Sequence, residues 1–199
     1  MKALLMVLMS SGSKVKFRFA GISESVEVKE MLKISVKRVP MTTQQSLQML
    51  KENGILINHY AEKFILHPDF SAKSPEEMTV SIISLAELGL DKGASLDELF
   101  RYMKGTQFSP CPPDTGLFLR LAWTDQPQSQ NSILTGTHSS PDQAVTVLSE
   151  LLESDDSFPK GLYLRKVDGS LWLRGYVCDS AYRFPGDALF ALKFTGHKR

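Results

Sequence analysis

The stretch Phe158–Asp179, FPKGLYLRKVDGSLWLRGYVCD, indicates a β-hairpin more plainly than any other part of the chain. Two runs of alternating polar and apolar residues, 162–167 and 171–178, flank the dipeptide Asp168-Gly169. Aspartate and glycine both tolerate the positive φ angles that a type I′ hairpin turn requires at its two central positions. The sequence therefore predicts two antiparallel strands that are joined by this turn.

The turn also sets the pairing of the two strands. It implies three cross-strand pairs, which are Arg165 with Trp172, Leu164 with Leu173, and Tyr163 with Arg174. Side chains alternate between the two faces of a strand, so the leucines share one face and the aromatic and arginine side chains share the other. We expect the leucine face to be buried.

The same pattern of leucine, aromatic residue, leucine and arginine occurs at 117–120, and it predicts another strand over 117–123. The sheet face opposite the leucines would then form a candidate binding surface, because aromatic and arginine side chains are enriched at interface centres. Its members are Phe118, Arg120, Tyr163, Arg165, Trp172 and Arg174, with Asp125 and Gln126 in a loop at its edge. A helix that covers the rings, with the arginines reaching past it to solvent, is the open alternative.

The remaining segments predict an α+β fold. Alternation within 14–39 indicates N-terminal strands, and helical spacing or capping boxes indicate helices at 43–53, 56–66, 75–88, 95–104 and 141–153. The mainly antiparallel sheet would consist of strands 117–123, 162–167, 171–178 and 188–194. We divide the chain into an N-terminal β segment (1–40), a helical part (41–106) and an α+β part (107–199), with one compact domain as the alternative.

Composition limits the possible partners and the location. The 199 residues are 42% hydrophobic and 23% charged, as in an ordinary globular protein, and the net charge of +1 argues against general attraction to nucleic acid or a membrane surface. The longest apolar run, 3–9, is too short to span a bilayer. Two cysteines, Cys111 and Cys178, fit a reducing cytoplasm, with export through residues 1–13 as the alternative.

Helices 75–88 and 95–104 have the outline of a helix-turn-helix, but the composition disfavours DNA recognition. The second helix would open with Asp97 and Glu98, which phosphates repel. Stacking of a single-stranded nucleic acid on the aromatic surface is a minor variant of the binding hypothesis.

Few residues suggest catalysis or a cofactor. A thiol-dependent hydrolase is conceivable with Cys111 as nucleophile, His138 as base and Asp125 as orienting acid. Cys111 lies between two prolines, however, and not at a helix N-terminus, where a thiolate is stabilised. The four histidines lack metal-ligand spacing and the glycines form no phosphate-binding loop, so we expect no cofactor.

Several short motifs resemble a group of uncharacterised bacterial proteins. They read ELG at 87–89, CP at 111–112, Gly116, LRL at 119–121, DQP at 125–127 and LWL at 171–173. The resemblance runs from residue 87 to the end of the chain, and it implies no activity and assigns no functional residue. The favoured hypothesis is therefore a non-catalytic module that binds an unknown protein or small molecule, with the Cys111 hydrolase as the alternative.

Overall fold

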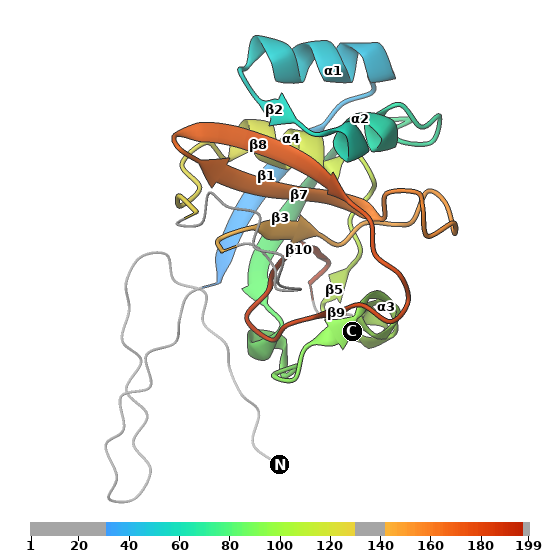
Figure 1. Ribbon diagram of the computed structural model, residues 1–199, viewed down its shortest axis with the longest axis vertical. Helices are drawn as coiled ribbons and strands as arrows, with labels where there is room; N and C mark the ends of the chain where they lie inside the picture. The colour runs from blue at the N-terminus through green and yellow to red at the C-terminus, as the bar shows by residue number, and fades with distance from the viewer. Residues whose placement is uncertain (1–30, 130–141, 197–199) are drawn as a thin grey trace, which may run out of the picture. The chain divides into compact units, whose positions relative to one another are not determined.

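The computed structural model describes residues 31–129 and 142–196. The predicted strands within 14–30, the segment 1–13 and His138 lie outside the described residues. The described residues from Leu32 onward cluster as one compact unit. Its helices and its large mixed sheet confirm the α+β class (Figure 1).

The helical elements are short. They are α1 (Thr43–Glu52), α2 (His59–Ile65), the 3₁₀ turn η1 (Ala86–Leu88), α3 (Leu96–Met103) and α4 (Thr115–Ala122). The strands are β1 (Leu32–Arg38), β2 (Leu56–Ile57), β3 (Glu76–Ser84), β4 (Ala94–Ser95), β5 (Phe108–Ser109), β6 (Val145–Val147), β7 (Gly161–Val167), β8 (Ser170–Tyr176), β9 (Arg183–Phe184) and β10 (Leu189–Phe194).

The sheet draws strands from all three predicted segments of the chain. Its order is β1-β3-β10-β6-β7-β8-β2, and β5 pairs with the last two residues of β10. The pairs β10–β6 and β8–β2 are parallel and the others in this sheet are antiparallel, which confirms the mainly antiparallel character. Strands β4 and β9 form a separate two-stranded sheet.

The predicted hairpin is confirmed residue by residue. Strands β7 and β8 pair Arg165 with Trp172, Leu164 with Leu173 and Tyr163 with Arg174. The turn residues Asp168 and Gly169 have φ angles of 49° and 76°, as a type I′ turn requires. Local turn chemistry is enough to set this register because the two strands are adjacent in sequence.

The predicted helices 43–53, 56–66 and 95–104 are also confirmed, apart from a shift of the second. It begins at His59, because the preceding residues form β2 and Asn58 caps the helix. The capping box of α3 forms as expected: the Ser95 hydroxyl accepts from the Glu98 N–H, and the Glu98 carboxylate accepts from the Ser95 N–H.

The predicted structure is wrong in three other segments. Residues 75–88 contain strand β3 and η1 in place of a helix. Of the predicted strand 117–123, residues 117–122 lie in helix α4, and 141–153 contain only β6 among the described residues. The β-branched residues of β3 pair with β1 on one side and β10 on the other, which outweighs the local capping signal. Short apolar runs such as 117–123 do not distinguish a helix from a buried strand.

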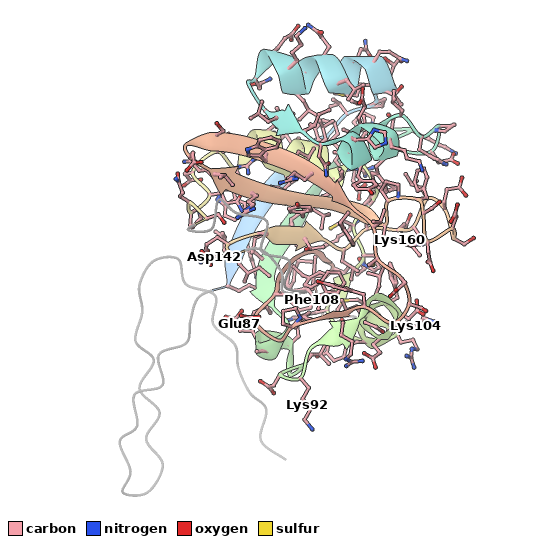
Figure 2. All side chains as sticks on the ribbon, viewed as in Figure 1. Glu87, Lys92, Lys104, Phe108, Asp142 and Lys160 are labelled. Carbon is pink, nitrogen blue, oxygen red and sulfur yellow. The ribbon has the colours of Figure 1, made fainter. Side chains whose placement is uncertain are left out.

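Helix α4 lies in the core. Residues 115–120 are all buried, and the helix contacts β1, β7, β8 and α1. Helices α1, α2 and α4 gather at one end of Figure 1 and α3 at the other. A second buried group, around the Phe184 and Phe190 rings at 5.0 Å, lies toward the α3 end. In Figure 2, Phe108 lies among packed side chains, whereas Lys92 extends outward from the ribbon.

Candidate functional site

Four of the predicted site residues come together on β7 and β8. In each of two neighbouring cross-strand pairs, an aromatic residue faces an arginine: Tyr163 faces Arg174 and Trp172 faces Arg165. The guanidinium carbon of Arg174 lies 5.3 Å from the centroid of the Trp172 ring and 6.0 Å from that of Tyr163. These distances place one cation against two aromatic rings, within the range of a cation–π interaction.

Helices α2 and α4 pack on the opposite, leucine face of the hairpin. A Cβ atom added at Gly116 of α4 would lie 3.0 Å from the Leu162 side chain, and one added at Gly175 of β8 would lie 2.4 Å from the Tyr60 backbone in α2. Both Leu162 and Gly175 belong to the leucine side. The rings of Tyr163 and Trp172 therefore point away from these two helices, and both side chains are half-buried.

Leu56 extends this face to the edge of the sheet. It pairs with Trp172 across the β2–β8 ladder, so the two side chains share a face, and it is 42% exposed. Leu56 is not among the predicted site residues because it falls inside the predicted helix 56–66. Its position next to Trp172 comes from a pairing between strands that are more than 100 residues apart, for which no local signal exists.

The two arginines of this face differ in how they are held. Arg165 is 4% exposed and its Nε donates to the Ser129 hydroxyl at 2.9 Å, which in turn donates to the Asp142 carbonyl at 2.6 Å. Arg174 is half-buried, and its Nε is a buried donor that lacks a hydrogen-bond partner. Within the described part of the chain Arg174 also makes no ion pair, so its charge is stabilised by the two rings without a counter-charge.

Phe118 and Arg120 do not belong to this face, and the prediction that placed them there is wrong. Both are buried in α4, because residues 115–122 form a helix. The Arg120 Nη1 donates to the Gln126 Oε1 at 2.5 Å, and the Gln126 Nε2 donates to the carbonyls of Gln143 and Leu164. Burial lowers the pKa of Arg120 to about 10, although the nearby Asp125 carboxylate opposes the shift. Asp125 itself is exposed.

Cys111 has the environment of a packed thiol. It is fully buried, its Sγ lies 3.7 Å from the Ala191 carbonyl oxygen, and burial raises its pKa to about 12. A thiol nucleophile needs an accessible thiolate with a lowered pKa, which is the opposite condition. The geometry around Cys111 therefore gives no support to the hydrolase hypothesis.

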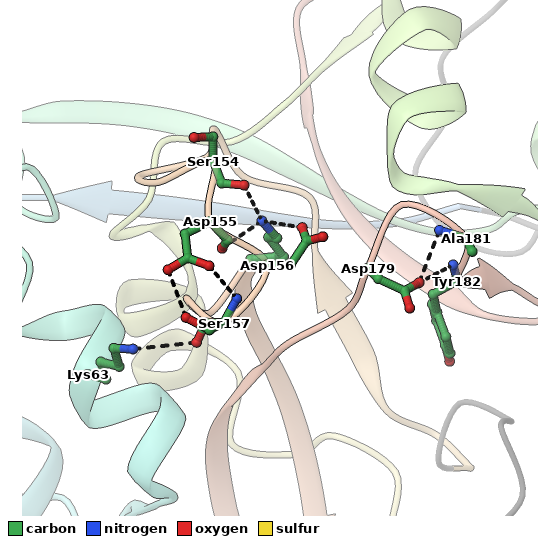
Figure 3. Close-up of polar contacts among 9 residues, drawn as sticks. Lys63, Ser154, Asp155, Asp156, Ser157, Asp179, Ala181 and Tyr182 are labelled. Atoms are coloured by element: carbon green, nitrogen blue, oxygen red, sulfur yellow. Dashed lines mark hydrogen bonds and ion pairs between the residues drawn. The ribbon is translucent and has the colours of Figure 1, made fainter.

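The acidic side chains near the hairpin form hydrogen bonds and ion pairs with groups close to them in sequence (Figure 3). Asp155 accepts from the Ser157 N–H at 2.8 Å, which lowers its pKa, and Asp179 accepts from the amides of Ala181 and Tyr182. The buried Lys160 donates to the Ser154 and Asp155 carbonyls and pairs with Asp156 at 3.2 Å. These contacts give the charged groups of the loop partners within the chain, so the loop gives no indication of a ligand site.

Within residues 31–129 and 142–196, no group of three or more histidine, cysteine, aspartate or glutamate side chains could hold a metal ion. No helix in those ranges is long and apolar enough to cross a membrane. Comparisons of the chain with protein-family models, curated proteins and solved structures give no significant match.

Proposed function

We propose that this protein is a non-catalytic binding module that holds a partner protein on the aromatic–arginine face, defined as Leu56, Tyr163, Trp172 and Arg174. The observation that carries the proposal is the Arg174 guanidinium, which lies against two rings and has no carboxylate partner in the described residues. A half-buried guanidinium without a counter-charge can form an ion pair with an anionic group of a binding partner.

The chemistry of the face favours a protein segment that carries an acidic side chain beside an apolar one. The acidic group would pair with Arg174, and the apolar group would pack on Trp172 and the exposed Leu56. A nucleic acid would bring a row of phosphates, whereas Asp168 is exposed at the turn of the same hairpin and the chain has a net charge of only +1. A single carboxylate matches a single available arginine.

The test uses an array of immobilised peptides in which Asp or Glu is flanked by Leu or Phe, with Asn and Gln versions as neutral controls. We expect the full-length protein to prefer the acidic peptides, and Arg174→Gln to weaken that binding about ten- to hundred-fold, since a hydrogen bond to a charged group contributes roughly 1.5–3 kcal/mol. Trp172→Ala should also lose binding. Lys166→Gln is the matched control, because Lys166 carries the same charge on the other face of β7.

Each variant is also measured by thermal unfolding, so that lost binding is separated from lost structure. Equal binding by the wild type and Arg174→Gln, both folded, would refute the proposal. Binding of oligothymidylate in place of the peptides, with a steep dependence on salt, would assign the face to single-stranded nucleic acid instead.

A further inference from the structure

We infer that the buried guanidinium of Arg120 is an internal site for a small oxyanion, either a carboxylate or a phosphate, which is separate from the aromatic–arginine face. Arg120 is 0% exposed and is the largest fully buried side chain among the residues that the structure describes. Only its Nη1 is bound, to Gln126, while Nε and Nη2 are buried donors without a partner.

This arrangement sets Arg120 apart from other buried charged side chains of the described chain. Arg38 pairs with Asp114 and with Glu76, and Lys160 pairs with Asp156 and two carbonyls. Arg120 makes no ion pair of that kind in the described residues, although the exposed Asp125 lies near enough to influence its pKa. A buried cation with two unused donors is costly unless an anion is bound to it.

The geometry of the unused donors defines the ligand. The N–H groups of Nε and Nη2 lie on the same edge of the planar guanidinium and point in parallel, which is the fork that binds two oxygens of one oxyanion. A single carbonyl oxygen could satisfy only part of this edge and would leave the charge uncompensated. A carboxylate or a phosphate satisfies both donors and supplies the opposite charge.

The guanidinium is held in place for such a ligand. Gln126 accepts from Nη1 with its oxygen and donates with its amide nitrogen to the carbonyls of Gln143 and Leu164. This amide therefore connects the end of α4 to β7 and prevents rotation of the guanidinium. The adjoining Thr124, Asp125, Pro127 and Gln128 are exposed, so the chain next to Arg120 reaches solvent.

The test compares sodium acetate, sodium phosphate and sodium chloride at equal ionic strength, with the full-length protein and two matched variants. In the wild type we expect acetate or phosphate at about ten times its Kd to raise the midpoint of thermal unfolding by roughly 3–6 °C more than chloride does. Arg120→Lys, which keeps the charge but lacks the fork, should lose this increment. Arg174→Lys should keep it, which makes the result independent of the proposed function.

The acetate and phosphate measurements also identify the class of ligand. A rise of the unfolding midpoint with acetate alone indicates a carboxylate ligand, and a rise with phosphate alone indicates a phosphate. Titration of the ¹⁵N-labelled wild type gives a second measurement that needs no variant. The Nε–H resonance of Arg120, which should exchange slowly with water because the group is buried, should shift in a saturable way with acetate or phosphate and not with chloride. Equal effects of all three salts on the wild type, without a saturable Nε–H shift, would overturn the inference.

Discussion

The Asn58 side chain forms two hydrogen bonds with the backbone of Gly175, 117 residues away in the sequence. Its Oδ1 accepts from the Gly175 N–H at 2.8 Å and its Nδ2 donates to the Gly175 carbonyl at 3.0 Å. The same Oδ1 accepts from the Ala61 N–H and so caps α2. One amide thus fixes α2 against β8, on the face of the hairpin opposite Trp172.

Replacement of Asn58 by Ala should lower the free energy of unfolding by about 2–3 kcal/mol, because it removes a helix cap and leaves two backbone groups of Gly175 unpaired. Urea unfolding followed by circular dichroism measures this loss. Asn58→Asp keeps the acceptor and loses only the donor, so it should cost less. A loss below about 0.5 kcal/mol for Asn58→Ala would show that water replaces the amide.

Gly175→Ala should destabilise the protein by about 3 kcal/mol or more. The added Cβ would lie 2.4 Å from the Tyr60 carbonyl carbon and 2.5 Å from the Ala61 nitrogen. Both are backbone atoms, which cannot relieve the clash by rotating as a side chain can. Gly169→Ala is the control: it has open space but a φ of 76°, so it should cost only about 1–2 kcal/mol. Similar unfolding midpoints for the two variants would contradict the close approach of α2 to β8.

Glu76 should contribute to the stability of the protein above pH 4.5 and lose that contribution in acid. The hydrogen bond from Lys193 and the charge of Arg38 lower its pKa below the usual 4.5. A carboxyl whose pKa is lower in the folded state stabilises that state when ionised, so the free energy of unfolding should fall as the pH drops from about 5 to 3.

The pH titration is repeated on Glu76→Gln, whose unfolding free energy should fall less steeply over the same range. Asp114, with a pKa raised by burial, contributes the opposite slope, and because Asp114 and Glu76 share Arg38 the comparison reports Glu76 together with its effect on Asp114. Parallel pH profiles for the two proteins would rule out the predicted role of Glu76.

The two cysteines should differ sharply in reactivity. Cys111 is fully buried with a pKa raised to about 12, so it should resist iodoacetamide at pH 8, whereas Cys178 is half-buried and should react slowly. Intact-mass analysis should give at most one adduct on the native protein and two after denaturation. Rapid modification of Cys111 in the native protein would contradict its burial and would reopen the hydrolase hypothesis.

Part of the candidate site could be predicted because one tight turn determines it. The pairing that aligns Tyr163 with Arg174 and Trp172 with Arg165 follows from the positive φ angles of two adjacent residues. Leu56 could not be predicted, since β2 is only two residues long and its partner is distant in sequence. The burial of Arg120 in α4 could not be predicted either, because the repeated sequence pattern is compatible with both a strand and a buried helix.

The sequence by itself determined the elements whose signals are local: the β7–β8 hairpin with its register, the helices α1 and α3, and the α+β class. These signals act through backbone dihedral angles and caps within a few residues. The tertiary structure alone decided that 76–84 is a strand between β1 and β10, and that 115–122 is a helix in the core. Such short apolar segments take the structure that their distant neighbours leave room for, because burial and long-range pairing contribute more free energy than local propensity.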